Sequence, residues 1–202
     1  MPSPLRNRLI FIRHGETDWN KEGRLQGQQD IPLNPRGRDQ ASAVGRLVRR
    51  WLGAEADSYL DGLDYWCSPL GRTRETMDRA LIAMGRPGQA YAFDDRLKEL
   101  SFGQWEGLTW ADVKPIDPEA LKRRKADKWG FVPPGGESYA MLEERVRPWL
   151  DVLDGDALVV AHGGVARTLL HMLGGVPADE AVDMDIHQGR ALVFEGDGFR
   201  WV

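Results

Sequence analysis

The chain lacks paired cysteines and long apolar runs: its 202 residues include one cysteine, Cys67. A single cysteine excludes an internal disulfide framework and any CxxC metal site. No apolar run approaches the roughly 20 residues that cross a bilayer. The apolar run near the N-terminus is interrupted by Arg13 and His14, which is not the pattern of a signal peptide. We therefore expect a cytoplasmic protein without a membrane partner.

An excess of positive charge is also missing, because the formal net charge is −4. This balance argues against a dedicated nucleic-acid binder, which would usually be strongly basic. The chain is long enough for one domain with a substantial core. It contains no internal repeat, low-complexity tract or dividing linker. We expect one domain over residues 9–202, preceded by a flexible leader over residues 1–8.

Strand-like and helix-like segments alternate along the chain. Short apolar runs predict strands over residues 9–12, 63–67, 91–93 and 157–161. Helical spacing of apolar residues predicts helices over residues 36–52, 73–84, 137–153 and 165–173, whereas residues 26–35 and 103–136 are irregular. A Gly-Asp-Gly turn between residues 191–195 and 199–202 predicts a terminal β-hairpin. The pattern indicates an α/β fold of three layers, α/β/α, in which a mostly parallel central sheet has an antiparallel edge and helices on both faces.

Two of the predicted strands end at a histidine and a glycine. The run Leu9–Ile12 leads into Arg13-His14-Gly15, and the run 157–161 leads into His162-Gly163-Gly164. Ligands of open α/β sheets bind outside the carboxyl ends of the strands. An arginine can hold phosphate oxygens, and a histidine can act as a nucleophile. A lone histidine would more often simply cap a strand, but Arg-His-Gly-Glu-Thr followed by Asn20 is far more specific.

Further motifs follow in a defined order. They are Leu25-Gln26-Gly27, Asp30–Gly37, Ser68-Pro-Leu-Gly-Arg72 with Thr76, Leu97-Lys-Glu99 with Gly103, Trp105-Glu-Gly107, Pro134–Ser138 and Val160–Gly164. With the Arg13–Asn20 segment, this series resembles the histidine phosphatase superfamily, the phosphoglycerate mutase-like group. The segment between Glu99 and Pro133 is short, as in the phosphatase branch that contains broad-specificity and α-ribazole phosphatases.

The resemblance implies a phosphomonoesterase that acts on small phosphorylated metabolites. In this family the histidine at the position of His14 becomes phosphohistidine, and the acid at the position of Glu99 acts as general acid and base. The remaining implied site residues are Arg13, Arg72 and a charged His162 around the phosphoryl oxygens, with Asn20, Gln26, Gly27 and Gly163 as further phosphate or substrate contacts. No metal or cofactor is implied. We expect a monomer or a homodimer.

Several alternatives stay open at the level of sequence. A phosphoglycerate mutase would share these residues, and a non-catalytic phospho-ligand module is a less favoured reading. Arg72 alone would as often be a solvated arginine as a site residue. The other acids that could replace Glu99 are Asp94, Asp95 and Glu106.

Other charged or reactive groups favour structural readings. We expect His171 and His187 to be packing or surface residues. The basic stretch 122–128 is more consistent with a solvated helix face than with recruitment of anionic substrates. Cys67 does not begin the C-x5-R loop of cysteine phosphatases, because the position of the arginine is occupied by Thr73, and we expect it to be buried in a strand.

Overall fold

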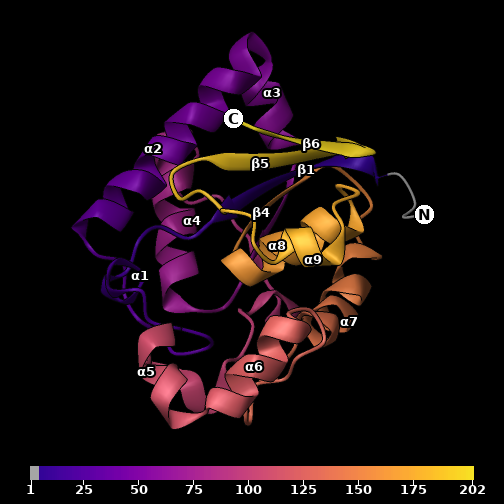
Figure 1. Ribbon diagram of the computed structural model, residues 1–202. Helices are drawn as coiled ribbons and strands as arrows, with labels where there is room; N and C mark the ends of the chain where they lie inside the picture. The colour runs from indigo at the N-terminus through magenta and orange to yellow at the C-terminus, as the bar shows by residue number, and fades with distance from the viewer. Residues whose placement is uncertain (1–4) are drawn as a thin grey trace.

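The computed structural model describes residues 5–202, which form a six-stranded sheet with helices on both faces (Figure 1). The strand order is β3-β2-β4-β1-β5-β6. The strands are β1 (Leu5–Arg13), β2 (Asp64–Cys67), β3 (Ala92–Phe93), β4 (Ala157–Ala161), β5 (Ala191–Gly196) and β6 (Gly198–Trp201). The first four strands pair in parallel, and β5 pairs antiparallel with both β1 and β6. The predicted three-layer fold with an antiparallel edge is confirmed.

The described residues contain four helices close to the predicted positions and five shorter ones. The helices are α1 (Asp18–Glu22), α2 (Pro35–Leu52), α3 (Ala56–Asp61), α4 (Gly71–Ala83), α5 (Trp110–Ile116), α6 (Pro118–Ala126), α7 (Tyr139–Leu150), α8 (Gly163–Met172) and α9 (Ala178–Ala181). Residue 35 begins α2 because the side chain of Asn34 accepts a hydrogen bond from the Gly37 amide, with proline at the first helical position. Ser138 caps α7, because its hydroxyl accepts a hydrogen bond from the Met141 amide.

The central strand β1 divides the core between the two layers of helices. Leu9 and Phe11 pack into one apolar cluster with residues of α7 and α8. Ile10 and Ile12 pack into the other cluster, with residues of α2 and α4. Alternate side chains of a strand point to opposite faces, so a continuous apolar run is what a strand with two covered faces requires.

Two predictions about irregular segments were wrong. Residues 5–8 were expected in a flexible leader, yet they belong to β1, where the Arg8 amide donates to Asp156 Oδ1 at 2.7 Å and the pairing with β5 continues past an irregularity in register. Residues 1–4 of that leader lie outside the described residues. The segment 103–136 is not simply irregular, because it forms α5 and α6 around Trp105, Val113 and a few neighbouring apolar side chains.

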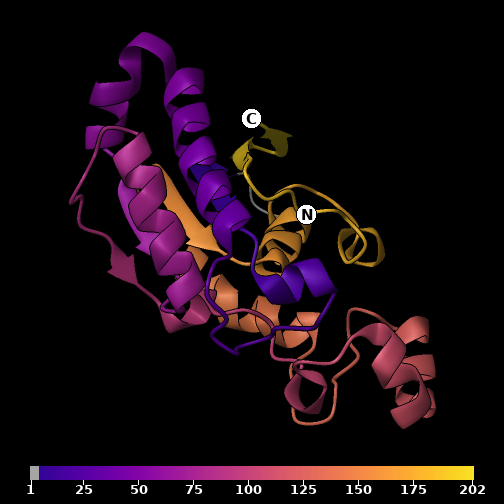
Figure 2. The same ribbon diagram turned by 90° about the vertical axis from the view of Figure 1, so that its left-hand side faces the viewer.

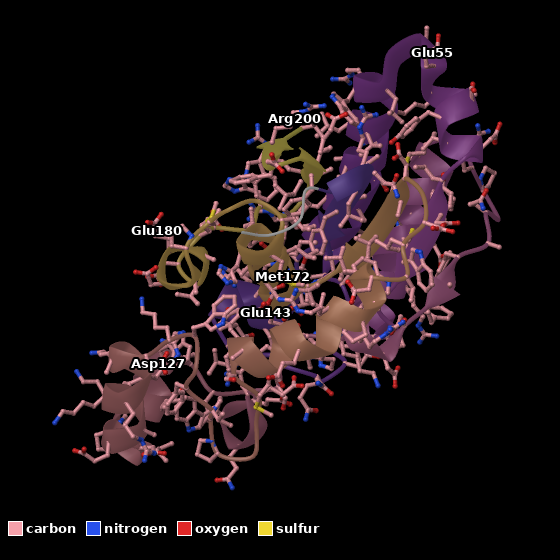
Figure 3. All side chains as sticks on the ribbon, turned by 90° about the vertical axis from the view of Figure 1, so that its right-hand side faces the viewer. Glu55, Asp127, Glu143, Met172, Glu180 and Arg200 are labelled. Atoms are coloured by element: carbon pink, nitrogen blue, oxygen red, sulfur yellow. The ribbon has the colours of Figure 1, made fainter. Side chains whose placement is uncertain are left out.

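Helices α5 and α6 form a small lobe that projects beyond the sheet layers (Figure 2). In Figure 3, Asp127 marks this lobe at one end of the molecule and Glu55 marks the opposite end, after α2. The basic residues of α6 are largely exposed, as expected for a solvated helix face, but Arg124 lies 4.1 Å from the ring of Trp110. Lys128 forms an ion pair with Asp183, at 2.5 Å, and so connects the lobe to the segment after α9.

Two other expectations, for Cys67 and for His171 and His187, agree with the structure. Cys67 is completely buried in β2, and burial raises the pKa of its thiol to about 12. His171 bonds to the carbonyl of Val176, and His187 is half-buried against the ring of Trp201, beside Asp185. Among residues 5–202 no helix is long and apolar enough to cross a membrane.

Candidate active site

The two histidine turns meet at the carboxyl ends of adjacent strands. Arg13 of β1 pairs in register with Ala161 of β4, and the His14 amide donates to the Ala161 carbonyl at 3.0 Å. The rings of His14 and His162 are 5.2 Å apart and meet edge to face. A cavity of about 140 Å³ opens at this point. Eight of the nine predicted site residues line it, namely Arg13, His14, Asn20, Gln26, Gly27, Arg72, Glu99 and Gly163.

His14 is held as a neutral imidazole with one defined tautomer. Its Nδ1 lies 2.8 Å from the carbonyl oxygen of Gly15, so Nδ1 carries the proton and Nε2 keeps a free lone pair. Burial, with Arg72 and Arg13 nearby, lowers the pKa of His14 well below its usual value. Gly15 is required here, because a Cβ atom at this position would lie 2.2 Å from the carbonyl oxygen of Gly37. The arrangement gives a neutral imidazole with an accessible lone pair on a rigid turn.

His162 lies beside His14 and is held by Ser68. Its Nε2 is 2.8 Å from the Ser68 hydroxyl, whereas its buried Nδ1 has no hydrogen-bond partner among the described residues. Burial and the nearby Arg72 lower the pKa of His162 well below its usual value. The charge expected on His162 around a phosphoryl group is therefore not present in the unliganded site. The reason is that two arginines and a low-dielectric environment disfavour a further cation.

The two predicted arginines are fixed by backbone carbonyls. Arg13 donates to the carbonyl of Ile186 at 2.8 Å, and Arg72 donates to those of Gln29 and Gly27 at 2.5 and 2.8 Å. Arg72 is completely buried, which excludes the solvated alternative. Desolvation by burial lowers the pKa of both guanidinium groups. The Nε atoms of both are buried without a partner in the described part of the chain, so each arginine has unused donor capacity.

Glu99 is the one of the four candidate acids that lines the cavity. Its Oε1 accepts hydrogen bonds from the amides of Leu100 and Gly164, at 2.9 and 3.0 Å. Asp94 is paired with Arg96 and Asp95 with Lys98, whereas Glu106 accepts from backbone amides next to the cavity. The side chain of Glu99 is thus placed against the first turn of α8, where the positive end of the helix favours an anion.

The remaining predicted contacts supply polar groups around the same space. The side-chain oxygen of Asn20 accepts from the Thr17 amide, so its NH₂ group is the part free for a ligand. Gln26 is buried, and its side-chain oxygen has no partner among the described residues. Gly27 adopts φ +53°, and a Cβ atom there would lie 1.9 Å from a carboxylate oxygen of Glu106. Gly163 begins α8, where backbone amides point toward an anion.

Several residues at the site were not found from the sequence. Arg167 and Tyr139 line the cavity. Gln188 donates to the carbonyl oxygen of His14 and to the side-chain oxygen of Asn20, each at 3.1 Å. Only Arg167 had a usable signal, because it follows Gly163 by one helical turn and therefore shares its helix face.

The described residues contain no group of three or more histidine, cysteine, aspartate or glutamate side chains placed to hold a metal ion. Positive charge in the cavity comes from arginines, four of which line it: Arg13, Arg24, Arg72 and Arg167. Arg24 is compensated by an ion pair with Glu22 at 2.6 Å.

The sequence model of the histidine phosphatase superfamily (branch 1) matches residues 9–202. The chain belongs to this superfamily. It is 34% identical over 186 residues to a glucosyl-3-phosphoglycerate phosphatase of Mycolicibacterium vanbaalenii, which covers 85% of this chain and 76% of that protein. It is 28% identical over 198 residues to a 2,3-bisphosphoglycerate-dependent phosphoglycerate mutase of Parvibaculum lavamentivorans, covering 95% of this chain and 91% of the mutase.

A solved structure shares the fold of this member of the superfamily over nearly its whole length. The crystal structure of a putative α-ribazole-5'-P phosphatase from Escherichia coli superposes with a TM-score of 0.76 at 26% sequence identity, covering 97% of this chain and 94% of that chain. The family resemblance inferred from the motifs is therefore confirmed, and both phosphatases and mutases are among the relatives of this histidine phosphatase.

Proposed function

We propose that the protein is a metal-independent phosphomonoesterase that hydrolyses small phosphorylated metabolites through a phosphohistidine on His14. The observation that carries the proposal is the state of His14: a neutral ring whose Nδ1–H donates a hydrogen bond to the Gly15 carbonyl, beside two buried arginines. A neutral imidazole with a free Nε2 lone pair is what attack on phosphorus requires.

In the first step, His14 Nε2 bonds to phosphorus and the ester P–O bond breaks. Glu99, protonated at this stage, transfers its proton to the leaving oxygen. In the second step, the Glu99 carboxylate takes a proton from water while the water oxygen attacks phosphorus. The P–N bond then breaks, which releases inorganic phosphate and restores the neutral ring.

The surrounding donors stabilise the charge of the transferred phosphoryl group. Arg13 and Arg72 have unused donor capacity at the cavity, and the first amides of α8 add the positive end of a helix. A dianionic phosphoryl group would offset the two arginines that lower the pKa of His162. His162 can therefore take up a proton when substrate binds and then donate through Nδ1.

Trapping the intermediate tests this proposal. Purified protein in excess EDTA should release phosphate from p-nitrophenyl phosphate and from alkyl phosphates. Rapid acid-free quenching with a labelled substrate should give an acid-labile, base-stable phosphoenzyme in the parent protein and none in His14→Ala. Turnover without any labelled protein, or turnover retained by a folded His14→Ala variant, would contradict the proposal.

The mutase alternative has support from a relative that covers most of the chain. It predicts a different product from the same intermediate, because the phosphoryl group returns to a bound sugar acid rather than to water. Incubation with 3-phosphoglycerate separates the two activities. Hydrolysis gives inorganic phosphate in step with substrate loss, whereas sustained 2-phosphoglycerate formation with little phosphate would establish the mutase.

A further inference from the structure

Arg167 lines the same cavity as His14, yet the proposed reaction makes no use of it. Its Nε donates to the carbonyl of Met184 at 3.0 Å, which fixes the guanidinium group. A Cβ atom on Gly163 would lie 3.4 Å from Arg167 Nη1 and 3.6 Å from Arg13 Nε, so the two guanidinium groups flank this glycine. Within the part of the chain that the structure describes, no carboxylate forms an ion pair with Arg167.

Tyr139 supplies a second polar group next to Arg167. Its side chain lines the cavity together with Arg167, and its ring is stacked on Trp129 with centroids 5.3 Å apart. Burial raises the pKa of Tyr139, so the phenol keeps its proton and remains a donor. A fixed guanidinium group and a phenol donor side by side are well suited to bind the two oxygens of a carboxylate.

The other charged groups of the cavity suffice to bind the phosphoryl group of the ester, so Arg167 is not needed for it. Arg24 is paired with Glu22, whereas Arg13 and Arg72 together balance a dianionic phosphoryl group. Glu99 is the only carboxylate that lines the described cavity, and its Oε1 is already bonded to the amides of Leu100 and Gly164. Arg167 is then an uncompensated cation in a partly desolvated site, a state that a second anionic group would stabilise.

Resting on the function proposed above, we infer that Arg167 and Tyr139 form a second anion site, and that the substrate is a phosphomonoester with a carboxylate close to the esterified carbon. The placement of the charged groups supports a short separation, because the guanidinium groups of Arg167 and Arg13 flank the same glycine, Gly163.

A matched pair of small esters tests the inference. Phosphoglycolate carries a carboxylate on the esterified carbon, and 2-hydroxyethyl phosphate has a hydroxymethyl group in its place. Neither ester is a phosphoglycerate that a mutase could isomerise, so phosphate release from each ester measures hydrolysis. The parent protein should show the higher kcat/KM with phosphoglycolate. Arg167→Met should lower that value by roughly 10- to 100-fold, the effect of losing a charge-assisted hydrogen bond, with a much smaller loss for 2-hydroxyethyl phosphate.

Two further variants and one control complete the test. Tyr139→Phe removes only the hydroxyl and should reduce the preference for phosphoglycolate, whereas Arg167→Lys should retain part of it through its charge. Arg147→Met removes a surface cation that is paired with Glu143 on α7, and it should leave the preference unchanged. Thermal melting of each variant reports whether the protein is folded.

The inference and the proposed function fail in different ways. Equal losses on both esters in Arg167→Met would show that Arg167 serves the transferred phosphoryl group, which overturns the second anion site while hydrolysis stands. A parent protein with no preference between the esters would overturn it as well. Absence of turnover with both esters and with p-nitrophenyl phosphate would instead contradict the phosphomonoesterase itself.

Discussion

The hydroxyl of Ser68 lies 2.8 Å from Nε2 of His162, and both side chains are completely buried. A hydroxyl can either donate or accept, so Ser68 can serve the neutral and the protonated imidazole without moving. The contact leaves His162 Nδ1 as the nitrogen without a partner in the described residues. Ser68 is therefore well placed to orient the second histidine of the site, although it does not itself line the cavity.

Replacing Ser68 by alanine should weaken both the fold and the reaction. Loss of the partner leaves a buried imidazole nitrogen unsatisfied, which costs about 1–3 kcal/mol of unfolding free energy. We expect kcat to fall by roughly 10-fold and the alkaline limb of its pH profile to move to lower pH, because protonated His162 loses its acceptor. Ser42→Ala, which removes a hydroxyl bonded to the Arg38 carbonyl on α2, is the control. An unchanged pH profile would assign Ser68 a purely structural role.

The two buried histidines should make stability depend on pH. Burial lowers the pKa of both His14 and His162 in the folded state, whereas an unfolded histidine has a pKa of about 6.5. Below that pH the unfolded chain binds more protons, so the contribution of these neutral rings is complete above about pH 6.5 and decreases as pH falls. Each ring should contribute a slope of about 1.4 kcal/mol per pH unit.

Urea denaturation between pH 7.5 and pH 5.5 measures this slope. His14→Asn cannot titrate in this range, so it should show about half of the histidine contribution to the slope. A free energy of unfolding that is equally high at both pH values in the parent protein would contradict the neutral state assigned to the two rings.

Esters that differ in their need for a proton on the leaving oxygen can test whether Glu99 is the general acid. Glu99→Gln keeps an oxygen that accepts from the Gly164 amide but has no proton to transfer. We expect kcat/KM to fall by about 10²- to 10⁴-fold for alkyl phosphates and much less for p-nitrophenyl phosphate, whose leaving group needs no acid. Glu106→Gln is the matched control. Equal losses for both esters would contradict a general acid at Glu99.

We predict that Gln188, which is far from His14 and Asn20 in the sequence, holds these two site residues in position. Its NH₂ group donates to the His14 carbonyl and to the Asn20 side chain. Gln188→Glu replaces this donor by an acceptor with a negative charge, so kcat should fall by roughly 10-fold with little loss of unfolding free energy. Gln89→Glu, at an exposed turn, controls for the added charge. Identical kinetics for the two variants would remove Gln188 from the site.

Much of the architecture could be predicted because its signals are local. The apolar runs of β1 and β4 specify strands with two covered faces, and the turns after them place His14 and His162 at one edge of the sheet. The two turns then meet because β1 and β4 are neighbours in the sheet, an order that the structure supplies. The helices α5 and α6 were missed, because their apolar residues pack into a small separate cluster rather than along one continuous helical face.

The sequence by itself determined the parts of the site that lie within a turn of each strand end, Arg13-His14-Gly15 and His162-Gly163. Only the tertiary structure decided that Arg72 is buried, that Glu99 rather than Glu106 lines the cavity, and that His162 is neutral before substrate binds. These properties depend on burial and on charges from segments far apart in the chain. The pKa and the exposure of a side chain depend on all the groups packed around it, and a local sequence motif does not specify those groups.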